Sequence, residues 1–576
     1  MKSKINLFCL FVALWFSGCS KMNLKDPSEE SLDPAVHSGN KMSTMGSAVG
    51  DVVGKVTVGY QGWFIAPGDG TLVNQFWHTN MEMWPDMREY TVSYVTPLGN
   101  LGNGQPAKMF SSYDQSTVNL HVQWMGESGI DCIALQRFSG DLGDPAFKAQ
   151  KDGMALKIKT AAEAASKKFY IMYDISGHQG MQTTVQNDWV NSILPANLLS
   201  SSAYAKQNGK PVVCIFGLGY KGAPVPGGGD PVACLQLINF FKAQGCYVIG
   251  SIPMDWRSPV SGNGGFSRAN FASVYDALNM IQPWVVPAEV GPTYQPWIQG
   301  DYTYCENHGI DYQPGIYPGT SFHNTNGSTQ NLIPRNHGDF MWSQAAVLKT
   351  VGVKSLYVAM FDEFNEATQI MKTAENSSMA PTNHWYLNLD ADGVAVSSDF
   401  YMRLTNDIGK MVVKGTIPYQ ATHPTPHTIG GAATIPNGTY KIVNRNSGLA
   451  LDAQGQLTAN GTPVVQYAYA GGNNQKWILT SLGGDTYKIV GVQSGKALDV
   501  NGQSLADGAK VQLYTDNGGS NQKWVITPTS GGYYTVKSVQ SSKVMDVEGN
   551  VTTPGALLQQ WTGNGGNNQQ WAFQAP

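Results

Sequence analysis

Charged residues, cysteines and long hydrophobic runs are all scarce in this sequence. Only 14% of its 576 residues are charged, and the 37 basic and 41 acidic side chains nearly cancel without forming long runs of either sign. Because nucleic acids and anionic membrane surfaces are bound by basic patches, neither is expected as a partner. The chain has instead 65 glycines, 15 tryptophans and 26 tyrosines, a composition that favours turns and aromatic surfaces able to contact polar ligands such as sugars.

The cysteine pattern argues against both disulfide and metal cross-links. Of the seven cysteines, five follow Cys19, and no two of these form a C-x-x-C pair. An odd number with this spacing predicts neither a disulfide framework nor a zinc site, so no metal and no cofactor are expected. Cys132, Cys214 and Cys246 lie in or beside apolar runs, where we expect buried free thiols.

The one long apolar run lies at the N-terminus. Lys2 and Lys4 precede an apolar stretch over residues 5–16, which leads into Ser17-Gly18-Cys19. This pattern predicts a signal peptide over residues 1–18 and not a spanning helix. Its end resembles a bacterial lipobox, with phenylalanine where leucine is usual, and the resemblance implies cleavage before Cys19 and a lipid on its thiol. The alternative is cleavage beyond Cys19, which would leave that thiol free.

Lipidation of Cys19 would anchor the protein in the outer membrane of a Gram-negative bacterium, facing the periplasm or the cell surface. The chain is too long for one hydrophobic core, so several domains are expected. Residues 19–51 have too little apolar content to fold and predict a flexible tether. We expect domains over residues 52–412 and 437–576, a linker over 413–436, and a monomer.

The C-terminal region repeats one pattern three times, with a step of 47 residues. Each copy opens near a tyrosine, at Tyr440, Tyr487 and Tyr534, and ends in an Asn-Gln-x-Trp motif. Alternating, turn-rich segments in triplicate predict short β-hairpins that close together around a pseudo-threefold axis.

This pattern closely resembles the ricin-type β-trefoil, also called carbohydrate-binding module family 13. The family's Q-x-W tryptophans, here Trp477, Trp524 and Trp571, belong to its core. Its sugar site combines an Asp, an aromatic residue and the Asn before Q-x-W, because an aromatic face accepts a sugar ring while Asp and Asn bond to hydroxyls. The alternative is that these Asp residues only cap turns. The three sets are Asp452, Tyr467 and Asn474; Asp499, Tyr514 and Asn521; and Asp546, Trp561 and Asn568.

Between residues 52 and 412, apolar strand-like runs alternate with longer helical patterns, for example over 146–168 and 339–350. This alternation predicts βα units and a parallel sheet. Eight units predict a (β/α)8 barrel, so the expected fold class is a multidomain chain with an α/β TIM barrel and an all-β β-trefoil. The strands are expected at residues 56–60, 130–138, 169–175, 212–216, 246–252, 280–286, 311–317 and 355–361.

Chemistry in such a barrel takes place at the C-terminal ends of the strands. The residues expected there are strongly polar and aromatic, and a long insertion follows the first strand. We predict as substrate-binding residues Trp63, Trp77, His78, Arg137, Tyr173, Asp174, Asp255, Trp256, Arg257 and Tyr317.

Three carboxylates, Asp362, Glu363 and Glu366, lie within five residues at the end of the eighth strand. At a barrel mouth they would repel one another and raise at least one pKa, which suits a proton donor beside a proton acceptor. A solvated acidic loop or a set of calcium ligands is the alternative.

Residues 363–370, which read EFNEATQI, resemble the E-x-x-E-x-T-Q-I stretch of glycoside hydrolase family 99, the endo-α-mannosidases and mannanases, and more loosely family 71. Residues 59–63 and 385–401 are also similar. In family 99 the first Glu takes the proton of the sugar's 2-hydroxyl, which attacks the anomeric carbon, and the second protonates the departing oxygen. By match, these are Glu363 and Glu366. The family's usual Trp and His between the two Glu residues, and the Gly after them, are Phe, Asn and Ala here, which affects the expected substrate more than the reaction class.

We therefore expect a retaining endo-glycosidase that cuts an α-linked, mannan-like polysaccharide while the trefoil holds the glycan. Two Glu residues three positions apart on one loop favour the same-side, substrate-assisted route. The ordinary route places an acid and a nucleophile or base on opposite sides of the bond and would recruit Asp174 or Asp255. An α-glucanase or xylosidase-like hydrolase on the same barrel, and a non-catalytic surface glycan-binding protein, are the alternatives.

Overall fold

The computed structural model describes residues 46–576 except 77–79, 259–264, 429–434, 436, 484–485 and 530–532. The predicted signal peptide, Cys19 and most of the predicted tether lie outside the described residues. The chain divides into two compact units, Met1–His427 and Thr428–Pro576, and this division falls within the predicted linker. In the ranges described, no helix combines the length and the apolar character needed to cross a bilayer.

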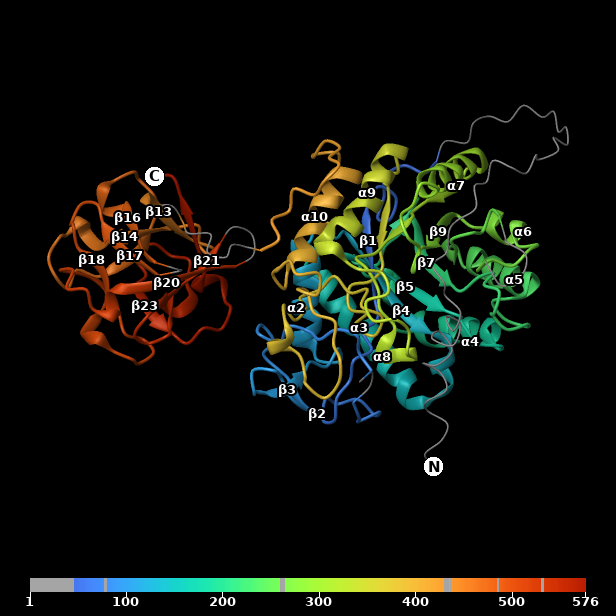
Figure 1. Cartoon of the computed structure of the whole chain (residues 1–576), viewed down its shortest axis with the longest axis horizontal. Helices are drawn as coiled ribbons and strands as arrows, with labels where there is room; N and C mark the ends of the chain where they lie inside the picture. Colours follow the sequence, from blue (N-terminus) through green and yellow to red (C-terminus); the bar gives the residue numbers. More distant parts are fainter. Residues whose placement is uncertain are drawn as a thin grey trace. The chain divides into compact units, whose positions relative to one another are not determined.

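The first unit is a barrel of parallel strands, several of which are labelled in Figure 1. The hydrogen-bonded order runs β10-β9-β8-β7-β5-β4-β1-β12-β11. Only Gln313 and Pro314 separate β10, which pairs with β9, from β11, which pairs with β12. One extended run therefore closes the sheet, and the predicted eight-stranded barrel is confirmed. Its strands are β1 (Val56–Tyr60), β4 (Cys132–Phe138), β5 (Lys168–Asp174), β7 (Lys210–Phe216), β8 (Tyr247–Pro253), β9 (Met280–Trp284), β10 (Asp311–Tyr312), β11 (Gly315–Ile316) and β12 (Leu356–Val358).

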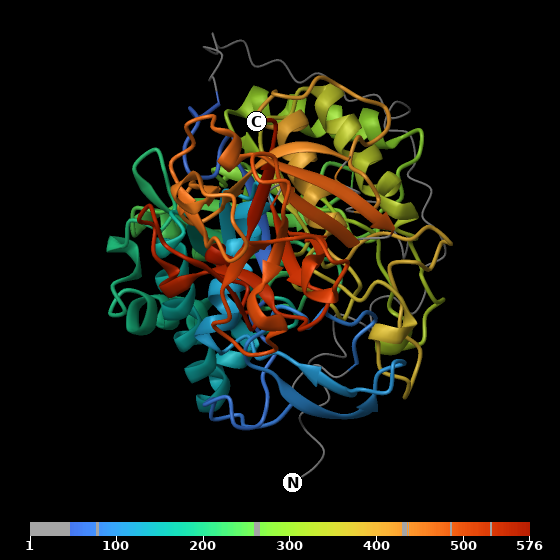
Figure 2. The same cartoon turned by 90° about the vertical axis from the view of Figure 1, so that its left-hand side faces the viewer.

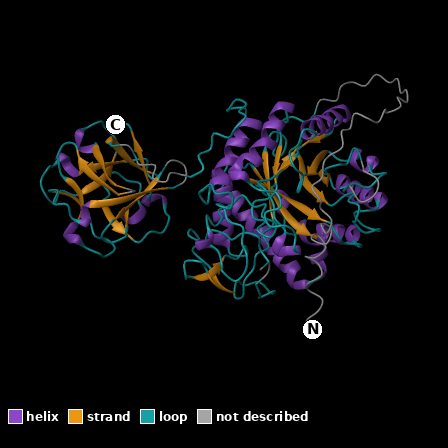
Figure 3. Ribbon diagram, viewed as in Figure 1, coloured by secondary structure: helices purple, strands orange, loops and turns teal. Residues whose placement is uncertain are grey.

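Helices surround these strands, purple around orange in Figure 3. The helix α3 begins where the side chain of Asp144 accepts hydrogen bonds from the N–H groups of Ala146 and Phe147, with Pro145 in the first turn. Both features favour a helix start. The helices are α2 (Gln115–Glu127), α3 (Pro145–Ala164), α4 (Met181–Asp188), α5 (Pro231–Ala243), α6 (Ala272–Asp276), α7 (Tyr294–His308), α8 (His323–Asn326), α9 (Asp339–Val351) and α10 (Phe400–Val412).

The barrel strands are buried on both faces, as their unbroken apolar runs predict. The centre of the barrel is filled: a Cβ placed on Gly59 would lie 2.2 Å from both the Met360 sulfur and the Tyr357 hydroxyl oxygen. Only glycine fits there. The cysteines predicted to be buried free thiols, Cys132, Cys214 and Cys246, are buried and unpaired.

The long insertion after β1 carries a hairpin of β2 (Tyr94–Asn100) and β3 (Pro106–Met109). In Figures 1 and 2 this hairpin lies at the lower edge of the barrel unit. A short strand, β6 (Lys206–Gln207), pairs with β7 outside the barrel order.

The second unit is a β-trefoil. Strands β13, β16, β17, β20, β21 and β24 pair in succession, and β24 returns to β13, so this sheet also closes. Each repeat adds one hairpin, and the Q-x-W tryptophans Trp477, Trp524 and Trp571 are fully buried. The strands are β13 (Gly438–Asn444), β14 (Ala450–Ala453), β15 (Val464–Tyr467), β16 (Trp477–Gly483), β17 (Thr486–Gly491), β18 (Ala497–Val500), β19 (Val511–Tyr514), β20 (Lys523–Pro528), β21 (Tyr534–Ser538), β22 (Val544–Val547), β23 (Leu558–Trp561) and β24 (Trp571–Gln574).

Candidate functional site

The loop that follows β12, residues 362–367, is anchored to the turn that follows β1. Asp362 is fully buried, and its carboxylate oxygens accept hydrogen bonds from the backbone N–H groups of Gln61 (2.8 Å) and Gly62 (2.9 Å). Gly62 has a φ of +57°, which glycine adopts without steric cost. Because β1 and β12 are neighbours in the sheet, these bonds fix the acidic loop at the C-terminal edge of the barrel.

The two predicted catalytic residues sit differently in this loop. Glu363 is 3% exposed; its Oε2 accepts a hydrogen bond from Gln61 Nε2, and its Oε1 is buried without a hydrogen-bond partner among the described residues. Glu366 is half-buried, and its backbone carbonyl accepts from Thr320 Oγ1 (2.6 Å) and Ser321 N (3.0 Å). A buried acceptor that lacks a donor is costly, so a ligand hydroxyl bound at Glu363 Oε1 would be stabilised.

Burial raises the pKa of every carboxyl group in the loop. Burial raises the pKa of Glu363 well above its ordinary value, and the charges of Glu366 and Asp362 add to the effect. Burial also raises the pKa of Glu366 to about 7, with further contributions from Asp174 and Glu82, and that of Asp362 to about 7. A carboxyl group with a pKa near 7, such as Glu366 or Asp362, can exchange protons near neutral pH, as a general acid or base must.

Polar groups continue along the strand ends beyond the loop. Asp174, at the end of β5, accepts a hydrogen bond from Ser176 N (2.8 Å), and burial raises its pKa to about 6. Asp255, after β8, accepts from Phe266 N (2.9 Å), and its Oδ1 is buried without a partner in the described part of the chain. Burial raises the pKa of Tyr220, after β7, and Tyr275, Asp255 and Asp174 add to the rise.

Aromatic side chains accompany these carboxylates. The predicted substrate-binding residue Trp63 is half-buried and stacks on Phe138, with ring centroids 5.3 Å apart and planes 13° apart. Phe216 and Trp284 meet edge to face at 5.1 Å. Phe138, Phe216 and Trp284 are the last residues of β4, β7 and β9. Sequence reasoning missed them because Phe216 and Trp284 lie in apolar runs that also suit the core.

Two predicted substrate-binding residues contact helices instead of the acidic loop. The Arg137 guanidinium donates to Asp188 (Nε to Oδ2, 2.7 Å) and pairs with Asp152, and it is 1% exposed. The Tyr173 hydroxyl also donates to Asp188 (2.7 Å). Side chains alternate between the two faces of a strand, so Tyr173 points outward where its neighbour Asp174 points inward. These contacts indicate structural roles for Arg137 and Tyr173.

The side chains after β8 divide in the same way. Trp256 is buried edge-on between Tyr275 (5.6 Å) and Tyr304 (5.0 Å). Arg257 forms an ion pair with the buried Asp301 of α7. Both therefore join the barrel to its outer helices. Of the predicted residues in this segment, only Asp255 has a buried side-chain oxygen without a partner in the described part of the chain.

Of the three other predicted binding residues, the structure describes only Tyr317. The Tyr317 hydroxyl donates to the carbonyl of Ala288 (2.7 Å), and its ring packs edge-on against Phe340. Trp77 and His78 lie outside the described residues. Within the described ranges, no group of three or more His, Cys, Asp or Glu side chains is arranged to hold a metal ion.

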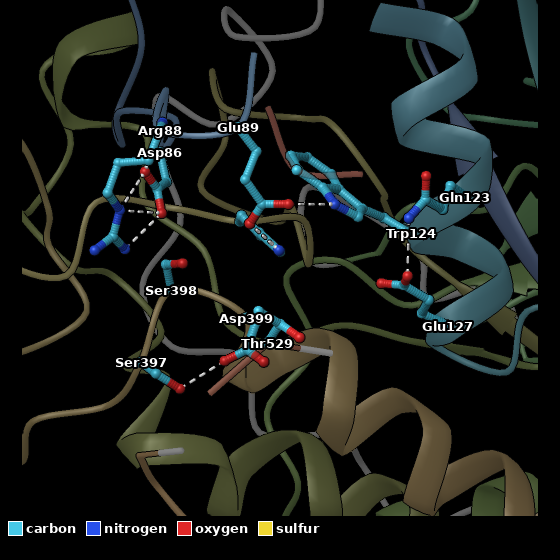
Figure 4. Close-up of polar contacts among 12 residues, drawn as sticks. Asp86, Arg88, Glu89, Gln123, Trp124, Glu127, Ser397, Ser398, Asp399 and Thr529 are labelled. Carbon is cyan, nitrogen blue, oxygen red and sulfur yellow. Dashed lines mark hydrogen bonds and ion pairs between the residues drawn. The ribbon is translucent and has the colours of Figure 1, made fainter. Parts of the chain in front are cut away.

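The insertion after β1 is held against the segment that follows the acidic loop. Figure 4 shows Arg88 paired with Asp86, at 2.6 Å, and the Trp124 indole donating to Glu89 (3.3 Å). Glu89 also pairs with Lys372, whose ammonium lies 4.8 Å from the Trp124 ring centroid. These contacts join the insertion to Lys372, in the segment that follows the acidic loop.

In the trefoil, each predicted Asp and Asn are hydrogen-bonded to each other. Asn474 Nδ2 donates to Asp452 (2.8 Å), and the equivalent distances are 2.7 Å for Asn521 to Asp499 and 2.7 Å for Asn568 to Asp546. The third member of each set is exposed: Tyr467 is 50%, Tyr514 39% and Trp561 41% accessible.

The first repeat differs from the other two. Gln512 and Gln559 donate to Oδ1 of Asp499 (2.9 Å) and Asp546 (3.0 Å). The position paired with Asp452 across β14 and β15 is Val465, which has no donor. The Oδ1 oxygen of the first repeat therefore lacks the amide that its counterparts have.

Comparisons with known proteins support this architecture. A family model, the ricin-type beta-trefoil lectin domain-like family, matches residues 428–514 and 520–575, so the chain carries a ricin-type β-trefoil lectin domain at its C-terminus. No curated protein matches the chain.

Solved structures resemble each part separately. The designed 3-fold symmetric protein ThreeFoil is 45% identical over 24% of this chain and 100% of its own, with a TM-score of 0.24. An exo-beta-1,3-galactanase from Clostridium thermocellum is 41% identical over 24% of this chain and 30% of its own, with a TM-score of 0.24. The GH99 endo-alpha-mannosidase from Bacteroides thetaiotaomicron is 14% identical over 63% of this chain and 99% of its own, with a TM-score of 0.45.

Proposed function

We propose that the barrel is a retaining glycoside hydrolase that cuts α-linked, mannan-like polysaccharide from within, and that the trefoil binds glycan for it. The observation that carries this proposal is the acidic loop at the strand ends of a (β/α)8 barrel. This loop holds three carboxyl groups with raised pKa values. One of them, Glu363, has a buried oxygen without a hydrogen-bond donor among the described residues.

In the proposed reaction, Glu363 accepts the proton of the sugar's 2-hydroxyl, and that oxygen attacks the anomeric carbon. Glu366 gives its proton to the departing glycosidic oxygen, so the bond breaks without charge building up on the leaving group. Water then opens the resulting 1,2-anhydro sugar, with Glu366 now acting as base and Glu363 returning the proton to the 2-oxygen. Two inversions at the same carbon give overall retention.

The assignment of roles follows from the contacts of the two groups. Burial and the charges of Glu366 and Asp362 raise the pKa of Glu363, and the Gln61 side-chain amide, which donates to Glu363, opposes this rise by favouring the ionised form that a base needs. Glu366, half-buried, reaches the substrate side as a proton donor. A two-carboxylate route through Asp174, at the end of β5, is the second candidate mechanism, and the charge of Asp174 adds to the raised pKa of Glu366.

Digestion of a glycan panel tests the proposed function. We expect the protein to release oligosaccharides from α-mannan, as seen by product sizing, and a double variant Glu363→Gln/Glu366→Gln to release none. Products from α-glucan or arabinoxylan but not from α-mannan would identify an α-glucanase or a xylosidase-like hydrolase instead. Retention of these glycans without any product would instead identify a binding protein.

We also propose that Cys19 carries a lipid that holds the protein in the outer membrane, which rests on the Ser-Gly-Cys step after the apolar run. A Cys19→Ala variant should leave the membrane fraction. Unchanged fractionation would count against the anchor.

A further inference from the structure

Glu82 lies beneath the acidic loop, and none of the sequence patterns pointed to it. It is fully buried in the insertion that follows β1. Its backbone N–H donates to the carbonyl of Phe364 (2.9 Å). Its carboxylate accepts from Ser321 Oγ (2.8 Å), Asn324 N (2.5 Å) and Thr325 N (3.1 Å). One residue thus contacts the acidic loop with its main chain and residues 321–325 with its side chain.

Two of the residues that donate to the Glu82 carboxylate also donate to backbone carbonyls of the acidic loop. Ser321 N donates to the carbonyl of Glu366 (3.0 Å), and Thr325 Oγ1 donates to the carbonyl of Asn365 (2.9 Å). The three consecutive carbonyls at positions 364–366 are therefore fixed by Glu82 directly or through one intermediate residue. Buried polar networks in which each member is bonded restrict a segment to one conformation.

The Glu82 carboxylate also adds negative charge beside Glu366. The other ionisable groups facing Glu366 are Asp174, from the end of β5, and Glu363, on the same loop. Burial raises the pKa of Glu82 itself, and the hydrogen bonds from Ser321, Thr325 and Asn324, with the charge of His323 of α8, oppose that rise and favour its ionised form. Burial raises the pKa of Glu366 most, and the charges of Asp174 and Glu82 raise it further, which keeps a proton donor protonated at higher pH.

We propose that Glu82 is a positioning residue for the reaction. It holds the Phe364–Glu366 backbone in place, and its carboxylate adds one negative charge to the surroundings of the proton donor Glu366. This inference rests on the proposed function of Glu363 and Glu366. Glu82 would contribute in two ways, by fixing the backbone and by its negative charge, and two variants of Glu82 distinguish these contributions.

Glu82→Gln removes the charge and preserves the contacts, because the amide oxygen can accept from Asn324 and Thr325 while its NH₂ donates to Ser321 Oγ. The alkaline limb of the kcat/KM profile on the cleaved glycan should then move to lower pH by about 0.5–1 unit, with kcat at acid pH nearly unchanged. Glu82→Ala removes both contributions and should lower kcat about tenfold or more at every pH, since small displacements of reacting groups are costly.

Glu89→Gln is the matched control, because Glu89 lies in the same insertion but pairs with Lys372 and Trp124 away from the loop; its profile should match that of the wild type. A Glu82→Gln profile that superimposes on the wild type would overturn the proposal. Glu366→Gln, measured alongside, separates the two hypotheses. If it turns over natural glycan as fast as the wild type, the proposed function fails; if it is inactive while Glu82→Gln is unshifted, only the role of Glu82 fails.

Discussion

At the scale of single residues, Glu363 and Glu366 titrate as a pair. Burial is the largest cause of the raised pKa of each residue, and the charge of Glu366 raises the pKa of Glu363 further. Two such groups lose their protons in two separated steps that belong to the pair. The catalytic state is the one that holds a single proton, so activity on glycan should fall both below the first step and above the second.

The same burial should make the barrel less stable as the pH rises. A glutamate in an unfolded chain titrates at about 4.3, whereas Glu366 titrates at about 7 in the folded protein. Between these values the folded state binds more protons, so the free energy of unfolding decreases as the pH rises. Glu366→Gln should therefore raise the barrel's unfolding temperature by a few degrees at pH 8 and leave it unchanged at pH 4, as measured by calorimetry. A lower unfolding temperature at pH 8 would contradict the burial argument.

The substrate's 2-hydroxyl provides another test at this scale. In the same-side route the proton that Glu363 removes comes from that hydroxyl, so a 2-deoxy or 2-fluoro substrate should not be hydrolysed at a measurable rate. Efficient hydrolysis of either would exclude this route and favour the two-carboxylate route with Asp174.

Residues close together in the sequence could be assigned to the site from the sequence alone, whereas contacts between distant positions could not. Glu363 and Glu366 are three positions apart, so their proximity was evident from the sequence alone. Tyr173 and Asp174 are adjacent, yet only the second faces the site, because the inward phase of a buried strand is not visible when both faces are apolar. Glu82 reaches the loop across more than 280 residues, and no local pattern indicates such a contact.

At the scale of elements, the barrel strands were predictable because each is a short apolar run bounded by polar ends. Strand seven differed in detail: the expected run over 311–317 is divided into β10 and β11 at Gln313 and Pro314. Proline has no N–H to donate to a neighbouring strand, which fits a break at this point. The trefoil was predictable in full, since its three repeats show the same signature three times.

The hydrogen bonds of the trefoil repeats predict unequal costs of substitution. Asp499 accepts from the side-chain amides of Gln512, Asn521 and Gln522. Asp499→Ala would remove three hydrogen bonds, at about 0.5–1.5 kcal/mol each. It would leave the Gln512 amide without its acceptor, whereas Asn521 and Gln522 keep the carbonyls of Val500 and Thr515. Asp452 faces Val465 in place of a glutamine, so Asp452→Ala should lower the trefoil's unfolding temperature less. Equal losses in calorimetry would show that the missing amide has no consequence.

At the scale of the whole molecule, two units with separate cores suggest separable activities. The rings of Tyr467, Tyr514 and Trp561 are exposed on the trefoil and can be substituted together. The triple substitution to alanine should weaken retention on insoluble α-mannan by at least about tenfold, because several weak sites act together. Turnover of a small soluble glycoside should not change. Full retention by the triple variant would mean that the glycan binds elsewhere.

The leaving-group dependence of two single variants tests the central claim, that Glu366 donates the proton and Glu363 removes one. Acid assistance matters most for a poor leaving group and contributes about 10²- to 10⁴-fold. Glu366→Gln should therefore lose activity to that extent on natural glycan and far less on an activated aryl or fluoride glycoside, whereas Glu363→Gln should lose it on both. A loss below about tenfold for either variant on natural glycan, or the same loss on both substrates for Glu366→Gln, would contradict this assignment.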